Sequence, residues 1–170
     1  MKTTIIGILL FSATVAAQSQ PPKALDVPSA AMEAALKAAR PDAPLSDLPI
    51  RVIDVGGQHV GVAIVRRTKA EVNALVHDKI TEIYVVREGS GTMVTGGTLV
   101  DRAEISPTST VIGPSARGSR IEGGATRRVT PGDVIVLPPG TAHMFTSLDG
   151  NGTITYLTIR VDPARVLSLK

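Results

Sequence analysis

PGDVIVLPPGTAH, residues 131–143, is the stretch of this sequence that decides the fold. A Pro-Gly turn precedes a run of aliphatic residues, a second turn holds two prolines and a glycine, and His143 follows. Gly and Pro turns on both sides of a β-branched run predict a short antiparallel strand between tight turns. The pattern therefore predicts an all-β domain in which His143 begins the next strand.

The same alternation of short apolar runs and turn residues extends on both sides of this stretch, from Leu48 onward. The predicted strands cover 50–55, 60–66, 80–87, 92–95, 98–105, 125–129, 134–137, 143–148 and 153–161. The segment 106–124, which is rich in Gly, Ser and Pro, is expected to be the least regular part. Roughly nine or ten short strands at this spacing are typical of an antiparallel sandwich or barrel.

The N-terminus has the pattern of an export signal. Lys2 supplies a positive charge, an apolar run follows at 5–11, and Ala17 ends a stretch of small residues. This pattern predicts a signal peptide at 1–17 and a secreted protein, periplasmic in a bacterium. The apolar run is too short to span a hydrocarbon layer of ~30 Å, so a membrane anchor is disfavoured. The alternative is a buried N-terminal helix or strand.

Residues 18–47 are predicted to form a flexible lead-in and one short helix. The lead-in is polar and Pro-rich, whereas SAAMEAALKAAR at 29–40 consists mostly of helix formers. Ser29 is a candidate N-cap, and Pro41 ends the pattern. Because its apolar residues are mostly Ala, the helix is expected on the outside of a barrel formed by 48–170.

Composition limits the function classes. The chain is 43% hydrophobic and 19% charged, which fits one globular domain. It has no cysteine, so disulfides, thiolate metal sites and cysteine nucleophiles are excluded. The net charge is +3, and the Arg residues lack interleaved aromatics, which argues against a nucleic-acid partner.

Glu82 lies on one of the strongest predicted strands, where the two-residue period places it on one face with Tyr84 and Val86. His77 comes five residues before Glu82. If this face points inward, Glu82 can meet an imidazole from a neighbouring strand. The alternative for His77 and Glu82 is a hydrogen-bonded pair at the beginning of a strand, without a metal.

The strand that His143 begins supplies the second imidazole. The same period places His143, Phe145 and Ser147 on one face, so that the last two are candidate pocket residues. Two imidazoles and a carboxylate suit Fe(II), Mn(II), Ni(II) or Zn(II), with positions left open for a substrate. We therefore expect His77, Glu82 and His143 to hold a divalent metal.

These residues carry a resemblance to the cupin superfamily. The stretch 131–143 resembles the second cupin motif, although Ser147 stands where that motif ends in Asn. The stretch 77–89 resembles the first motif, in which His-x-His precedes Glu and Gly, but Leu75 occupies the first His position. The resemblance implies a double-stranded β-helix, or jelly-roll barrel, that is often dimeric. It also implies a metal held by three His and one Glu.

Further candidates follow from this interpretation. His59, on an earlier strand, is a candidate replacement for the missing imidazole. Glu82 is either a metal ligand or a general base, and Tyr84 is a pocket wall or a proton donor. Leu75 is expected in the pocket. Arg120 is a candidate contact for an anionic substrate, with a surface position as the alternative.

Two functional hypotheses stay open at this stage. The first is a metal-dependent enzyme of dioxygenase, lyase or isomerase type that acts on a small organic molecule. The second is a non-catalytic protein that binds a small ligand and whose metal site is degenerate. The absence of an imidazole at position 75 favours the second, and metal content discriminates between them. A structural or assembly role is a third hypothesis, without a supporting sequence feature.

Overall fold

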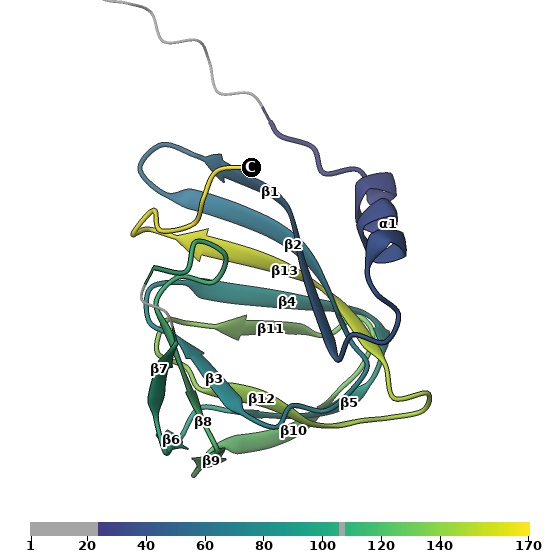
Figure 1. Cartoon of the computed structure of the whole chain (residues 1–170), viewed down its shortest axis with the longest axis vertical. Coiled ribbons are helices and arrows are strands. Elements are labelled where there is room, and N and C mark those ends of the chain that lie inside the picture. The colour runs from purple at the N-terminus through teal and green to yellow at the C-terminus, as the bar shows by residue number, and fades with distance from the viewer. Residues whose placement is uncertain (1–23, 106–107) are drawn as a thin grey trace, which may run out of the picture.

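Two antiparallel sheets face each other in the structure, a computed structural model that describes residues 24–105 and 108–170 (Figure 1). The predicted signal peptide, 1–17, lies outside the described residues. The first sheet has the order β1 (Leu45–Asp54), β2 (His59–Arg67), β13 (Ile154–Asp162), β4 (Thr81–Gly89) and β11 (Val134–Leu137). The second has the order β10 (Ala125–Val129), β5 (Gly91–Thr95), β12 (His143–Leu148), β3 (Ala74–His77), β8 (Ser115–Gly118) and β7 (Ala103–Ile105). A separate pair consists of β6 (Thr98–Val100) and β9 (Arg120–Glu122).

The chain crosses repeatedly between the two sheets, as a double-stranded β-helix requires. Strand β4 lies in the first sheet and β5 in the second, β11 returns to the first, and β12 returns to the second. Hydrogen bonding among the described strands gives two sheets with free edges rather than one closed ring. The predicted all-β double-stranded β-helix is therefore confirmed, but without the barrel closure that was expected.

The core fills the space between the sheets. Strand β4 buries Glu82, Tyr84 and Val86, and its other residues from Thr81 to Val85 are half-buried. Phe145 and Tyr156, from the two opposite sheets, pack with ring centroids 5.7 Å apart in the main hydrophobic cluster. Because few aromatics are available, the cluster has one further ring, that of Tyr84, and is completed by Met93 and aliphatic residues: Val65, Val86, Val129, Ile135, Leu137 and Ile154.

Helix α1 (Ser29–Ala38) lies outside the first sheet, against β1 and β2 (Figure 1). The predicted outside helix is thus present, and none of its residues is buried. Its N-cap is Pro28 rather than Ser29, and no side chain caps it. With this single short helix, the described part of the chain has no helix long and apolar enough to cross a membrane.

The strand predictions were wrong in four places, the first of which is that β3, which ends at His77, was not predicted at all. Strand β1 begins at Leu45, before the predicted start, and tolerates Pro49 because it is an edge strand. Asp101, with φ 54°, divides the predicted strand 98–105 into two pieces. The segment 106–124 contains β8 and β9, although its composition suggested irregular structure.

Candidate metal centre

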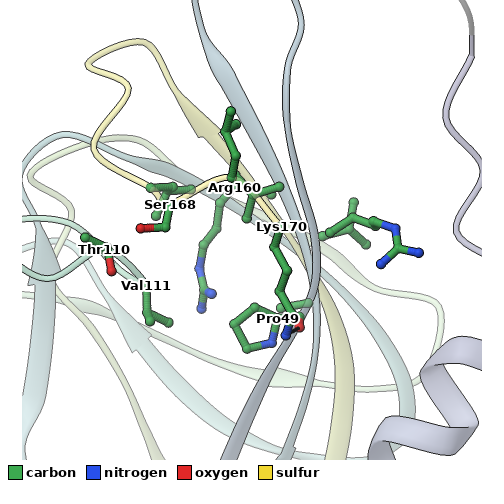
Figure 2. A pocket seen from close by; sticks show the side chains of 13 residues that line it. Pro49, Thr110, Val111, Arg160, Ser168 and Lys170 are labelled. Atoms are coloured by element: carbon green, nitrogen blue, oxygen red, sulfur yellow. Dashed lines mark hydrogen bonds between the residues drawn. The ribbon is translucent and has the colours of Figure 1, made fainter.

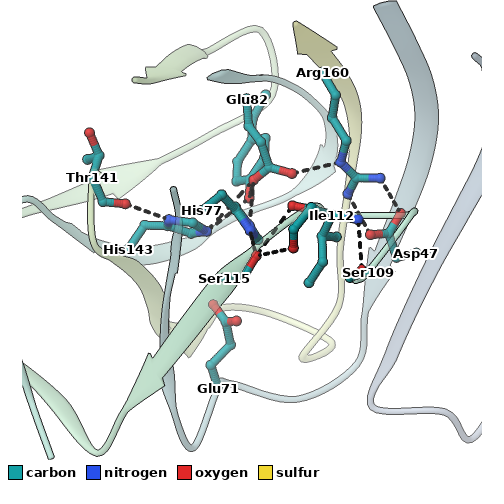
Figure 3. Close-up of polar contacts among 12 residues, drawn as sticks. Asp47, Glu71, His77, Glu82, Ser109, Ile112, Ser115, Thr141, His143 and Arg160 are labelled. Carbon is teal, nitrogen blue, oxygen red and sulfur yellow. Dashed lines mark hydrogen bonds and ion pairs between the residues drawn. The ribbon is translucent and has the colours of Figure 1, made fainter. Parts of the chain in front are cut away.

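Three buried side chains from three strands converge between the two sheets (Figure 3). His77 is the last residue of β3, Glu82 lies near the start of β4, and His143 is the first residue of β12. One ligand atom from each residue lies within 4.8 Å of the others. Since His77 is 6% exposed and the other two 2% each, the cluster lies in the interior.

The spacing of these atoms suits a common ion. The Oε2 atom of Glu82 lies 3.3 Å from the Nε2 atom of His77 and 3.8 Å from the Nε2 atom of His143. Metal–ligand bonds of 2.0–2.2 Å place neighbouring ligand atoms about 3.0 to 3.6 Å apart. The distance from Glu82 to His77 falls in this range and the distance to His143 slightly exceeds it, so the three residues can hold a divalent metal when they move closer together, with positions open for other ligands.

Hydrogen bonds on the far side of each imidazole turn the Nε2 atoms toward Glu82. The Nδ1 atom of His143 donates to the carbonyl oxygen of Thr141 at 3.1 Å, which fixes its proton there. The hydroxyl of Ser115 donates to the carbonyl oxygen of Gly113 and lies 2.7 Å from Nδ1 of His77, from which it accepts. Both Nε2 atoms therefore face Glu82, where a metal would take the place of the hydrogen bond between His77 and Glu82.

Arg160 on β13 holds the other side of the Glu82 carboxylate. Its Nε atom donates to Oε1 of Glu82 at 2.9 Å, and its terminal nitrogens pair with the carboxylate of Asp47. Tyr84 donates its hydroxyl to Oε2 of Glu82 at 2.6 Å. Burial opposes ionisation, but the hydrogen bond and charge of His77 and the charge of Arg160 hold the pKa of Glu82 well below its ordinary value. A carboxylate so held is a ligand rather than a general base.

Sequence reasoning missed Arg160, Asp47 and Ser115. The alternation in β13 could have revealed Arg160, because Arg160 lies on the same face of the strand as the buried residues Tyr156 and Thr158. A charge on the buried face of a strand requires a partner, and that partner is the carboxylate of Glu82. Asp47 and Ser115 gave no comparable signal, because both lie in segments predicted to be outside the barrel strands.

Comparison with known proteins agrees with this architecture. A family model described as "AraC-like ligand binding domain", a cupin-type domain, matches residues 120–169, which include β12 and His143. This match covers less than a third of the chain, and it agrees with the two facing sheets and the motif residues inside them. The chain has the cupin fold. No curated protein matches the sequence.

Solved structures with a similar fold include cupins and double-stranded β-helix proteins. KdgF from Halomonas sp. is 14% identical, with a TM-score of 0.43, over 73% of this chain and 85% of its own. A Klebsiella pneumoniae protein with a double-stranded β-helix domain is 14% identical, with a TM-score of 0.44, over 78% and 89%. A cupin superfamily protein from Desulfitobacterium hafniense is 15% identical, with a TM-score of 0.40, over 73% and 82%. Because the identities are below 25% and the TM-scores are below 0.5, these similarities say nothing about the activity of this protein.

The remaining candidate residues divide into two groups. Leu75 pairs with His143 across β3 and β12 and lines the cavity beside Glu82, as expected of the missing His position. Phe145 is buried but belongs to the hydrophobic core. Ser147 is exposed, because a β-bulge between Phe145 and Ser147 reverses the alternation on β12.

His59 and Arg120 lie outside the metal cluster. His59 begins β2, is buried, and contacts the carbonyl oxygen of Leu167 through Nδ1 at 2.8 Å, so it anchors the C-terminal segment. Arg120 pairs with Glu122 at 2.5 Å on β9, in the separate antiparallel pair of β6 and β9. The geometry supports neither His59 as a ligand nor Arg120 as a substrate contact.

Two adjoining cavities lead to the cluster. The inner one, here called the chamber, has a volume of about 100 Å³. The outer one, the vestibule, has a volume of about 220 Å³ and shares Leu45, Arg67 and Leu75 with the chamber. The other chamber residues are Asp47, Val65, His77, Glu82, Tyr84, Ile112, Tyr156, Thr158 and Arg160.

A larger cavity of about 370 Å³ lies beneath the C-terminal segment (Figure 2). Its walls include Val52, Ala63 and Leu167, so the lining is mostly aliphatic. Figure 2 shows the Arg160 side chain projecting between Ser168 and Pro49. Because Arg160 lines this cavity and the chamber, its ion pairs separate an apolar compartment from the metal cluster.

In the protein without bound metal, we expect His143 to stay neutral at pH values well below 6.5, the ordinary pKa of histidine. Complete burial penalises the imidazolium and lowers the pKa of His143 to about 4, although the charge of Glu82 opposes this shift. The unfolded chain takes up a proton near pH 6.5, so this contribution to stability is present above pH 6.5 and lost as the pH falls through about 4. Imidazole ¹⁵N shifts measured by NMR check this; titration of His143 near pH 6.5 contradicts it.

Proposed function

We propose that this protein is an exported cupin that binds one divalent metal through His77, Glu82 and His143 and acts on a small organic molecule. The observation that carries the proposal is the convergence of two Nε2 atoms and one carboxylate oxygen within 4.8 Å. Iron, manganese, nickel and zinc all suit this donor set. When bound, such a metal supplies Lewis-acid stabilisation of a negatively charged oxygen, or a site for O₂. Dioxygenase, lyase and isomerase reactions all fit this chemistry.

Tyr84 helps to shape the proposed site. Tyr84 directs its hydroxyl at the ligand oxygen of Glu82 and lies 3.3 Å from Nε2 of His143. Burial and the charge of Glu82 hold the pKa of Tyr84 well above its ordinary value, so the phenol stays protonated. It therefore acts as a hydrogen-bond donor that positions Glu82, and it lines the chamber that would hold a ligand.

Metal titration tests the proposal. The protein, purified without chelator or His-tag, is expected to bind one equivalent of Mn(II) or Fe(II), measured by calorimetry and by elemental mass spectrometry. His143→Ala is expected to abolish this binding, because it removes one of three ligands. His59→Ala is the matched control, since it removes another buried imidazole but should leave metal content unchanged. Less than about a tenth of an equivalent in the parent protein contradicts the metal site.

A second candidate function is non-catalytic binding of an apolar ligand, and the cavity of about 370 Å³ favours it. Drug-sized ligands occupy cavities of this volume and lining. A protein without bound metal that still binds a fluorescent probe such as anilinonaphthalene sulfonate, with the same affinity in His143→Ala, supports this function instead.

We propose export from the N-terminal pattern alone. Lys2, the apolar run and the small residues before residue 18 are the support. Expression of the full chain in a bacterium, followed by fractionation and N-terminal sequencing, is expected to yield a protein that begins at Gln18 outside the cytoplasm. A cytoplasmic protein that retains its first residues contradicts this.

We also propose that the protein forms a homodimer through the outer face of the first sheet. Val134 and Val136 on edge strand β11 are 57% and 56% exposed, and they pair with the outward-facing residues Val85 and Ile83 of β4. A sheet that is apolar on both faces is normally covered on both, and α1 covers only the region of β1 and β2. A twofold contact between two such faces buries this surface.

Light scattering after size-exclusion chromatography tests the dimer. The parent protein is expected to have the mass of two chains, and Val136→Lys is expected to give monomers, because a lysine on this face cannot be buried. Val72→Lys, at an 85% exposed loop position, is the control and should remain dimeric. A monomeric parent protein contradicts the proposal.

A further inference from the structure

We infer that the chamber binds the carboxylate group of a small monoanionic acid and that the hydroxyl of Thr158 is its hydrogen-bond partner. The inference rests on the proposed metal site and names the class of molecule that this site takes. Three independent features of the chamber carry it: a hydroxyl without a partner, a charge imbalance and a small volume.

The hydroxyl of Thr158 is buried without a hydrogen-bond partner among residues 24–105 and 108–170. Thr158 has no exposed surface, and it lies on β13 beside Tyr84 of β4, two residues before Arg160. Its side chain lines the same chamber as His77 and Glu82. A buried hydroxyl without a partner is unfavourable, so its presence at this position indicates a ligand that accepts its proton.

The fixed charges around the chamber indicate the charge of that ligand. Asp47 and Glu82 pair with Arg160, and Glu71 pairs with Arg67 at 2.9 Å. Three carboxylates and two guanidinium groups leave a single negative charge, which a divalent metal with neutral imidazoles converts into a single positive charge. Uncompensated charge is costly in a buried site, so a monoanion completes the balance.

The volumes of the chamber and of the vestibule indicate a carboxylate with a short substituent. The chamber, at about 100 Å³, holds roughly three water molecules, since each takes about 30 Å³ in the liquid. A carboxylate fits this space, and Thr158 supplies the unpartnered hydroxyl in its lining that can donate to it. Phosphate carries more than one charge at neutral pH and would find both arginines already paired. The adjoining vestibule, bounded by Leu45 and Leu75, accommodates a short aliphatic chain.

Butyrate and its neutral analogue butyramide provide a direct comparison. Binding of each to the Co(II)-loaded protein is measured by calorimetry and by the visible Co(II) spectrum, which responds to ligands that reach the metal. Butyrate is expected to perturb the spectrum and to bind at least tenfold more tightly than butyramide. Thr158→Val, which removes the hydroxyl at nearly constant shape, is expected to weaken butyrate binding about tenfold. Thr81→Val, on the outer face of β4, is the control and should not change it.

Stability separates a ligand-binding hydroxyl from a structural one. Thr158→Val should retain the parent affinity for Co(II) and the parent unfolding temperature or a higher one, because the hydroxyl has no partner to lose. Failure of the parent protein to bind Co(II) overturns the proposed metal function itself. Normal Co(II) binding without butyrate binding, equal affinity for butyramide, or full butyrate binding by Thr158→Val overturns the carboxylate inference. A lower unfolding temperature for Thr158→Val overturns the assignment of its hydroxyl to a ligand.

Discussion

Replacing Arg160 with methionine is expected to lower the free energy of unfolding by about 3 to 5 kcal/mol. The side chain of Arg160 is 6% exposed and bridges Glu82, which is 3% exposed, and Asp47, which is 22% exposed. Its removal leaves the buried carboxylate of Glu82 without its cationic partner, and methionine fills the space without replacing the charge. Since domains of this size are stable by roughly 5 to 15 kcal/mol, the loss is a large fraction of the total.

Urea unfolding followed by circular dichroism measures this effect. Arg128→Met is the matched control, because Arg128 forms an exposed ion pair with Asp149 and its loss should leave the midpoint nearly unchanged. The double variant Arg160→Met, Asp47→Leu should recover part of the stability, because it removes one of the two carboxylates left unpaired. A loss below about 1 kcal/mol in Arg160→Met would show that solvent compensates Glu82 and that the site is not closed.

The sequence was most informative where strands alternate regularly. The two-residue period predicted that Glu82, Tyr84 and Val86 share the buried face of β4, and the structure confirms it. The turns around 131–143 likewise predicted that His143 begins a strand. These features are local, because side-chain direction in a regular strand follows from position alone.

The sequence failed where the alternation is interrupted or where a long-range contact decides. The β-bulge after Phe145 turns Ser147 outward, and no residue in that strand is of a type that predicts a bulge. The cationic partner of Glu82, Arg160, comes from β13, whose position beside β4 is set by the folding of the whole chain, and the partner of Arg160, Asp47, comes from the more distant β1. His59 was a candidate ligand because of its residue type, but in the folded chain it contacts the carbonyl oxygen of Leu167 in the C-terminal segment instead of the metal cluster.

Introducing histidine at Leu75 is expected to raise the metal affinity by on the order of 10-fold to 100-fold. Leu75 and His77 share one face of β3, both line the chamber, and Leu75 is the direct neighbour of His143 across the strands. A histidine at this position supplies a third imidazole to an ion already held by two imidazoles and a carboxylate. The position is half-buried, so the ring is desolvated only in part.

Competition with a chelator of known affinity measures the change for Mn(II) and Zn(II). Leu75→Phe is the control for altered packing and should bind metal like the parent protein, because it adds no ligand. Combined with His143→Ala, the Leu75→His substitution should restore measurable binding, since three ligands are again present. If Leu75→His binds metal no better than Leu75→Phe, the ion does not lie between His77 and His143, and the cluster is a hydrogen-bonded network around Glu82.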